Sequence, residues 1–242
     1  MLLKQNLLQL FLARTPEVHF SSLRAILVIA PHPDDEILGL GGFLVRQIRS
    51  GKRVLIAYLT GGEKSLEDIA PAMVVDERHR LSVAVHVRLG LVPEQAFWCA
   101  FPDGALPRKG SAGFDGAVDR LVELIGAVEP DAVFVTHPLD TWPYDHVAAF
   151  EIASEALRRR SLPCDLYGYW VWLWYSMPLK RLLRLNWRNI SRIPVHGELR
   201  EKLVLTDMYL KPKAPNGKPW SGVLPKAMTD AFRYPYEVVE KF

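Results

Sequence analysis

The sequence predicts a Rossmann-like, three-layer α/β sandwich with a mostly parallel β-sheet. Two observations predict this fold class. Short apolar runs rich in β-branched residues recur along the chain, and helical hydrophobic patterns separate them. Continuous apolar strands indicate burial on both faces, which is typical of a parallel sheet covered by helices. In such sheets ligands bind beyond the carboxyl ends of the strands, so a functional site is expected there.

The expected elements alternate along the chain. Strands are expected over residues 25–30, 54–59, 132–135 and 167–172. Helical patterns cover residues 37–50, 74–89, 114–128 and 146–160. The first 20 residues predict an amphipathic helix, because polar residues interrupt the apolar ones and no signal-peptide cleavage site follows. A stretch dense in Pro, Gly and Lys at 211–222 predicts a long loop that could act as a lid.

The length of the chain fits one domain. A chain of 242 residues with 49% hydrophobic content can bury one substantial core. We expect a single domain over 1–242, with an N-terminal helix in 1–20, a core in 24–172, and helices and loops in 173–242.

Composition excludes several classes of protein. A net charge of +3 falls short of the basic stripe of a nucleic-acid-binding protein, so no nucleic-acid partner is expected. Cys99 and Cys164 lack CxxC or Cys/His spacing, which argues against a disulfide framework or a thiolate zinc site and favours the reducing cytoplasm. No apolar run reaches the roughly 18 residues needed to span a bilayer. The chain is expected to be soluble or at most membrane-peripheral.

A cluster of ionisable residues follows the first strand directly. Pro31-His32-Pro33-Asp34-Asp35-Glu36 places one imidazole and three carboxylates together at the carboxyl end of that strand. Imidazole and carboxylate are natural zinc ligands, and a divalent cation offsets the repulsion of crowded anions. One aspartate can bind the metal while its neighbour acts as general base. The competing interpretation is that the carboxylates only stabilise the dipole of the next helix, which does not account for His32.

A second histidine lies where the third predicted strand gives way to a helix. Asp145 and His146 end the loop that starts at Thr136. An open catalytic zinc site needs three protein ligands, and His146 could complete a set with His32 and Asp35. A single histidine is more often structural, so this assignment depends on the two loops meeting in space.

At this point the sequence resembles the PIG-L/LmbE-like family of zinc-dependent N-deacetylases. The family's first motif, [A/P]HPDDE, stands intact here as PHPDDE after a hydrophobic strand. The resemblance covers residues 24–172. It continues in family order through Thr60-Gly61-Gly62-Glu63, Arg78, Leu89-Gly90, Phe101-Pro102-Asp103-Gly104 and Asp145-His146.

The resemblance implies a set of roles and an activity. It matches His32, Asp35 and His146 to the zinc ligands, Asp34 to the general base, and Arg78 and Asp103 to substrate-contacting positions. The implied reaction removes an N-acyl group, most typically N-acetyl, from an amino sugar or amino-sugar conjugate, with zinc lowering the pKa of water to about 7. The implied cofactor is therefore Zn²⁺ and the implied partner is a glycoconjugate substrate.

The sequence departs from the family in its second motif. That motif usually reads HxDH, whereas residues 143–146 here read Pro-Tyr-Asp-His, so the first histidine is absent. His137 or Tyr144 is expected to take its catalytic place. The alternative is a catalytically impaired metal-binding or regulatory protein of the same fold.

Residues 177–193 predict a basic amphipathic helix. Lys180, Arg184, Arg188 and Arg192 recur every four residues, opposite an apolar face. Such a helix could contact anionic membrane lipids or a phosphate group, although a solvated charged face is the commoner explanation.

The glycines at 39, 41 and 42 raise a third hypothesis, a nucleotide-dependent oxidoreductase, which the sequence disfavours. Their spacing fails GxGxxG, and the acidic residues before them would repel a phosphate. They are interpreted as points of close helix packing.

Overall fold

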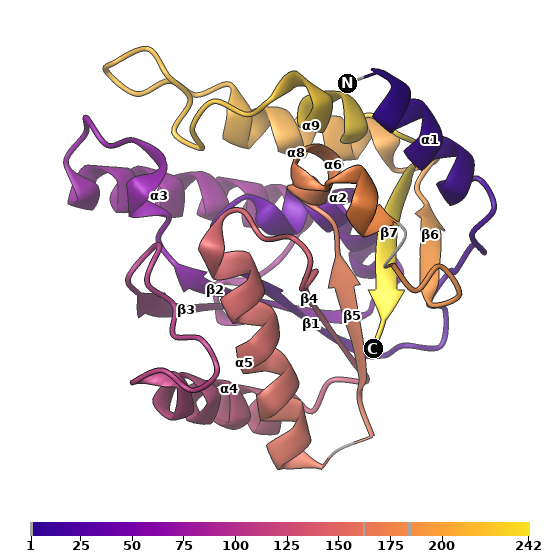
Figure 1. The fold of residues 1–242 in the computed structure, drawn as a ribbon. Coiled ribbons are helices and arrows are strands. Elements are labelled where there is room, and N and C mark those ends of the chain that lie inside the picture. The colour runs from indigo at the N-terminus through magenta and orange to yellow at the C-terminus, as the bar shows by residue number, and fades with distance from the viewer. Residues whose placement is uncertain (1, 162, 183–184) are drawn as a thin grey trace.

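A seven-stranded sheet lies between two layers of helices in a computed structural model that describes residues 2–161, 163–182 and 185–242 (Figure 1). The strand order is β3-β2-β1-β4-β5-β7-β6. The five strands from β3 to β5 run parallel, and β7 and β6 add antiparallel pairs at one side. The predicted three-layer α/β fold with a mostly parallel sheet is confirmed.

The strands and helices alternate as the sequence pattern predicts through the first two thirds of the chain. The strands are β1 (Ala25–Ala30), β2 (Arg53–Thr60), β3 (Ala96–Phe101), β4 (Ala132–Thr136), β5 (Asp165–Tyr169), β6 (Ile190–Pro194) and β7 (Tyr236–Lys241). The α-helices are α1 (Leu2–Leu12), α2 (Asp35–Arg49), α3 (Pro71–Leu89), α4 (Phe114–Val128), α5 (Tyr144–Arg160), α6 (Leu173–Ser176), α7 (Leu179–Leu182), α8 (Leu199–Leu210) and α9 (Lys226–Ala231). Two short 3-10 turns are η1 (Glu63–Ser65) and η2 (Pro93–Gln95).

The central strand β1 shows why an all-apolar run forms the middle of the sheet. All six of its residues are buried. Ile26 and Val28 pack on the face covered by α2, α3 and α8, and Leu27 and Ile29 pack on the face covered by α4 and α5 (Figure 1). Because alternate side chains of a strand point to opposite faces, AILVIA supplies both halves of the core.

The predicted helix over 177–193 is wrong. Residues 179–182 form the short helix α7, and residues 190–194 form β6, which pairs antiparallel with β7. Arg184 lies outside the described residues. Pairing with a strand near the end of the chain overrides the local helical periodicity. The basic helical face does not form, and the expected contact with membrane or phosphate through it has no support.

Four strands differ from the expectation. The strands β3, β6 and β7 carry no strong local signal and were not predicted. The strand predicted over 167–172 forms as β5 but ends at Tyr169. Residues 211–222 connect α8 to α9 without forming a helix, as expected. Across the part of the chain that the structure describes, no helix combines the length and apolarity needed to cross a membrane.

The glycines at the start of α2 allow close packing, as predicted. A Cβ on Gly39 would lie 2.3 Å from Tyr169 Cδ2, and one on Gly42 would lie 2.6 Å from Val195 Cβ. The helix is kinked at Leu40, whose φ of −136° is not helical.

A buried carboxylate from β7 supports the helix beyond this kink. Glu237 accepts the backbone N–H groups of Gly42 at 2.7 Å and Phe43 at 2.9 Å, and it pairs with Lys202 Nζ at 2.8 Å. Glu237 and Lys202 are both almost fully buried. Glu237 therefore acts as a cap supplied from a distant strand, and it holds the helix that follows the turn at residues 31–34.

Replacing Glu237 by alanine is expected to destabilise the protein by about 3–5 kcal/mol, because it leaves the Lys202 ammonium buried without a counter-charge. Urea unfolding measures this loss. Asp230→Ala breaks the exposed Lys226–Asp230 pair and serves as control, with an expected change within about 0.5 kcal/mol. Equal stability of the two variants would contradict the assigned role.

Candidate metal centre and active site

Two loops meet at the carboxyl ends of neighbouring strands. β1 leads into residues 31–34 and then α2, and β4 leads into residues 137–143 and then α5. Because β1 pairs with β4, the turn carrying His32 and the helix start carrying His146 lie side by side. The ring centroids of these two histidines are 5.4 Å apart. The structure thus brings together residues separated by more than one hundred positions.

The carboxylate of Asp35 lies between the two imidazoles. Its Oδ2 atom is 3.1 Å from His32 Nδ1 and 3.2 Å from His146 Nε2. All three side chains are buried and their ligand atoms lie within 4.8 Å of one another. These are the three residues that the sequence predicts as metal ligands.

The donor set fits a divalent cation. His146 Nδ1 lies 3.1 Å from Asp140 Oδ2, so an Nδ1–H donated to that carboxylate leaves Nε2 as a free ligand atom. His146 Nε2 is buried and lies 3.2 Å from Asp35 Oδ2, but it makes no well-formed hydrogen bond among the described residues. Burial opposes protonation of His146, but Asp35 and Asp140 outweigh it and raise its pKa to about 9. A zinc ion would take the place of the protons that these buried carboxylates otherwise hold on the imidazoles.

Asp34 lies beside this cluster and faces a different partner. Its Oδ2 atom is 3.0 Å from Arg78 Nη2, and both side chains are buried. Burial raises the pKa of the Asp34 carboxyl to about 6, although the Arg78 guanidinium opposes the shift. Arg78 also donates to the carbonyl oxygens of Gly62 and Pro33. The structure therefore makes Arg78 a partner of Asp34, with Nη1 and Nη2 engaged and Nε buried without a hydrogen-bond partner among the described residues.

Asp103 is held against the other nitrogen of His32. Its Oδ1 atom lies 3.0 Å from His32 Nε2, and its Oδ2 atom accepts the backbone N–H of Lys64 at 2.7 Å. Burial alone would raise the pKa of Asp103, but the His32 contact lowers it overall. Asp103 therefore orients His32, in addition to lining the cavity where a substrate contact is predicted.

Two carboxylates that the sequence analysis gave no role complete the surroundings. Asp140 orients His146 and also accepts the backbone N–H of Trp172 at 2.9 Å. Asp145 accepts the N–H groups of Gly104 at 2.6 Å and Leu106 at 3.1 Å, which fixes the 103–106 loop on the start of α5. No spacing rule marks either residue, although both lie within six positions of His146.

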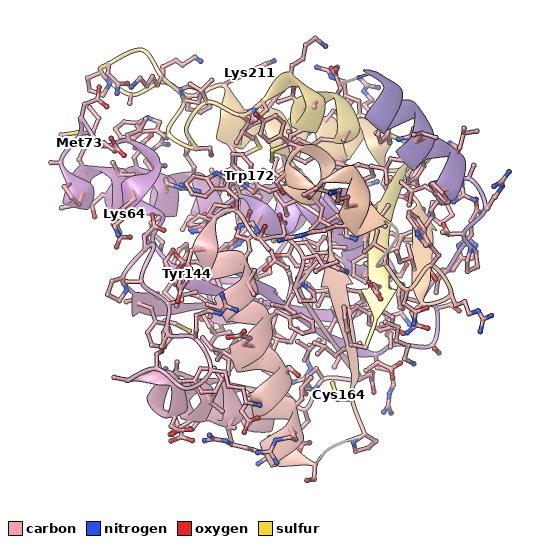
Figure 2. All side chains as sticks on the ribbon, viewed as in Figure 1. Lys64, Met73, Tyr144, Cys164, Trp172 and Lys211 are labelled. Atoms are coloured by element: carbon pink, nitrogen blue, oxygen red, sulfur yellow. The ribbon has the colours of Figure 1, made fainter. Side chains whose placement is uncertain are left out.

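A cavity of about 470 Å³ opens over the cluster. Its polar side includes His32, Asp34, Asp35, Lys64, Glu67, Arg78, Asp103 and Ser221. Its apolar side includes Leu38, Trp142, Pro143, Trp172, Val223 and Leu224. Lys64, Tyr144 and Trp172 reach it from three different segments of the chain (Figure 2). The predicted loop at 211–222 contributes Ser221 and Gly222 to its wall.

Of the two residues expected to replace the missing histidine, Tyr144 lines the cavity and His137 does not. His137 is buried away from the cavity, with Nε2 at 2.6 Å from Glu240 and Nδ1 accepting the N–H of Leu139. Both ring nitrogens are occupied, so the expectation of a catalytic His137 is corrected. Tyr144 lines the cavity, is 43% exposed, and has the Arg108 guanidinium 5.5 Å from its ring centroid.

The chain belongs to the PIG-L family. The family model described as GlcNAc-PI de-N-acetylase matches residues 27–157, which is more than half of the 242 residues. The match contains both loops of the cluster, and it confirms the expected family and the expectation of a deacetylase enzyme. No curated protein sequence matches the chain.

Solved structures share the fold at low sequence identity. N,N'-diacetylchitobiose deacetylase from Pyrococcus horikoshii is 18% identical with a TM-score of 0.71, covering 98% of this chain and 90% of its own. The zinc-inhibited form of teicoplanin deacetylase Orf2 is 16% identical with a TM-score of 0.63, covering 89% and 97%. GalB, a 4-carboxy-2-hydroxymuconate hydratase from Pseudomonas putida, is 16% identical with a TM-score of 0.64, covering 90% and 95%.

Removing the orienting carboxylate is expected to weaken metal binding. Asp140→Ala frees the His146 ring to rotate, and the Kd for zinc is expected to rise by about 10–100-fold. Isothermal titration of metal-stripped protein measures it. Asp207→Ala, which removes an exposed carboxylate on α8, is the control with an unchanged Kd. An unaltered zinc Kd in Asp140→Ala would show that Asp140 does not tune the site.

Proposed function

We propose that the protein is a zinc-dependent N-deacetylase that acts on an N-acetylated amino sugar or amino-sugar conjugate. The observation that carries the proposal is the joining of His32, Asp35 and His146 into one buried ligand set beside Asp34. Membership of the PIG-L family supports the amide-cleaving reaction. The names of two structural neighbours, a diacetylchitobiose deacetylase and a teicoplanin deacetylase, support a sugar-bearing substrate.

Under this proposal, His32, Asp35 and His146 hold the zinc ion. When bound, zinc polarises the amide carbonyl and makes water easier to deprotonate. Asp34 accepts the proton from water, and its pKa of about 6 suits a base that works near neutral pH. Arg78 fixes the direction of the Asp34 carboxylate. The products are an amine and a carboxylate.

The return of the proton to the leaving amine is proposed for Asp34 as well. The family histidine is replaced by Pro143, and His137 points elsewhere. Asp34 carries the proton after the first step, and it lines the cavity. Tyr144 is proposed to contact the substrate at the rim, because its hydroxyl-bearing ring is partly exposed there.

The cavity supports a sugar-sized substrate. Its volume of about 470 Å³ lies in the range of small-molecule sites. Trp142 and Trp172 add aromatic surface to the cavity lining, and aromatic faces suit the apolar faces of sugar rings. We propose the cytoplasm as the location because Cys99 and Cys164 are both free.

A second candidate function is metal binding without efficient hydrolysis. Pro143 favours it, since a proline cannot transfer the proton that the family histidine transfers. The hydratase among the structural neighbours shows that this fold also serves another reaction.

Two substitutions separate metal binding from catalysis. His146→Ala is expected to lose stoichiometric zinc and turnover together, because one of three ligands is gone. Asp34→Asn is expected to keep zinc and lose about 10²–10⁴-fold in kcat, because only proton transfer is removed. Zinc content by atomic spectroscopy and amine release from a panel of N-acetylated sugars measure both effects.

His196→Ala, which changes an exposed histidine outside the cavity, is the matched control and is expected to behave as wild type. Zinc-loaded wild-type protein that hydrolyses nothing in the panel would favour the second candidate. Turnover that survives complete removal of zinc would contradict the proposal.

A further inference from the structure

We infer that Glu36 and Tyr209 are positioning residues for Asp34, an inference that rests on the proposed role of Asp34 as the base. Tyr209 lies on α8, outside residues 27–157 that match the family model. Neither residue belongs to the proposed ligand set of His32, Asp35 and His146. Glu36 acts through its hydrogen bond to the backbone N–H of Asp34, and Tyr209 acts through Glu36.

The backbone of Asp34 needs such support. Its φ of 132° lies in the region that residues with a Cβ rarely adopt. A strained conformation persists only where surrounding contacts fix it. The N–H of Asp34 donates to Glu36 Oε2 at 3.0 Å, and its carbonyl accepts N–H groups from Ile37 and Leu38. Glu36 thus holds the strained peptide that aims the Asp34 side chain.

Glu36 is fixed in turn by a residue from the C-terminal part of the chain. It is completely buried, and its Oε1 atom accepts the Tyr209 hydroxyl at 2.7 Å. Tyr209 is also completely buried, in α8, which packs along α2 and α3. A buried carboxylate with both oxygens satisfied has one favoured orientation.

The polar contacts around Asp34 close into a ring. Tyr209 Oη lies 3.0 Å from Ser82 Oγ, which lies 3.0 Å from the carbonyl oxygen of Arg78. While Tyr209 donates to Glu36, the single Ser82 proton serves either Tyr209 Oη or that carbonyl. Arg78 then reaches the Asp34 carboxylate at 3.0 Å. The ring formed by Asp34, Glu36, Tyr209, Ser82 and Arg78 joins α2, α3 and α8. It therefore fixes Asp34 at its backbone and at its carboxylate together.

A packing role for Tyr209 and a positioning role predict different kinetics. Loss of packing lowers stability and acts independently of Asp34. Loss of positioning lowers proton transfer, so its effect disappears once the Asp34 carboxylate is gone. A double-mutant cycle distinguishes the two, because residues that act as a unit are not additive.

The test uses the zinc-loaded enzyme and a substrate that wild type hydrolyses. Tyr209→Phe is expected to lower kcat about 10–100-fold, with KM within about twofold and zinc content unchanged. In the Asp34→Asn background the same change is expected to cause no further loss. Tyr236→Phe removes a partly buried tyrosine hydroxyl that bonds Gln9 and none of the five ring residues, and it is the control with wild-type kcat. A normal kcat in Tyr209→Phe, or a full additional loss in the Asp34→Asn background, overturns the inference.

Glu36 offers a conservative rescue. In Glu36→Gln the amide oxygen can accept the Asp34 N–H while the amide nitrogen donates to Tyr209 Oη, whose proton then goes to Ser82. Glu36→Gln is therefore expected to retain more kcat than Glu36→Ala. Equal kcat in the two variants counts against the inference.

If wild-type protein hydrolyses no substrate, the proposed function fails. A crystal structure of Tyr209→Phe then still tests whether Glu36 and Tyr209 position Asp34. Rotation of the Glu36 or Asp34 carboxylate away from its position in wild type supports the inference. An unchanged Asp34 that still bonds Glu36 and Arg78 overturns it.

Discussion

The site depends on one carboxylate shared by two imidazoles. Asp35 Oδ2 lies within 3.2 Å of His32 Nδ1 and of His146 Nε2, and Asp140 lies behind His146. Burial makes each of these anions costly unless positive charge is close by. Protons on the imidazoles or one divalent cation can supply it. The pairing of β1 with β4 serves this charge balance, because it brings the two loops that carry the histidines next to Asp35.

The C-terminal part of the chain completes what the first two thirds begin. Glu237 accepts backbone N–H groups of α2 just after the kink at Leu40. Tyr209 donates a hydrogen bond to Glu36 in the first turn of the same helix. Ser221 faces the cavity from the loop between α8 and α9. The turn that carries His32 and Asp34 and the helix that follows it are thus supported by segments far away in the sequence. This arrangement explains why α8 and β7 pack against α2.

The sequence predicts those features that have a local signature. β1 is an unbroken apolar run, α4 has a clear helical period, and the PHPDDE cluster is visible because four ionisable groups within five residues are costly without a partner. Features set by distant partners were missed. Residues 190–194 form a strand only because β7 lies beside them, and Asp140 gains its role only from the position of His146. His137 failed as a catalytic residue because Glu240 of β7 occupies it.

Under the proposed function, the loss of the family histidine at Pro143 explains why the orientation of Asp34 has to be fixed. Pro143 and Trp142 make that wall of the cavity apolar where the family motif has a histidine, so no imidazole remains there to move a proton. A single carboxyl must then accept a proton and give it back. Such a group needs a pKa near the working pH and a fixed direction. Burial supplies the first by raising the pKa of Asp34 to about 6, and the hydrogen-bonded ring from Glu36 to Arg78 supplies the second.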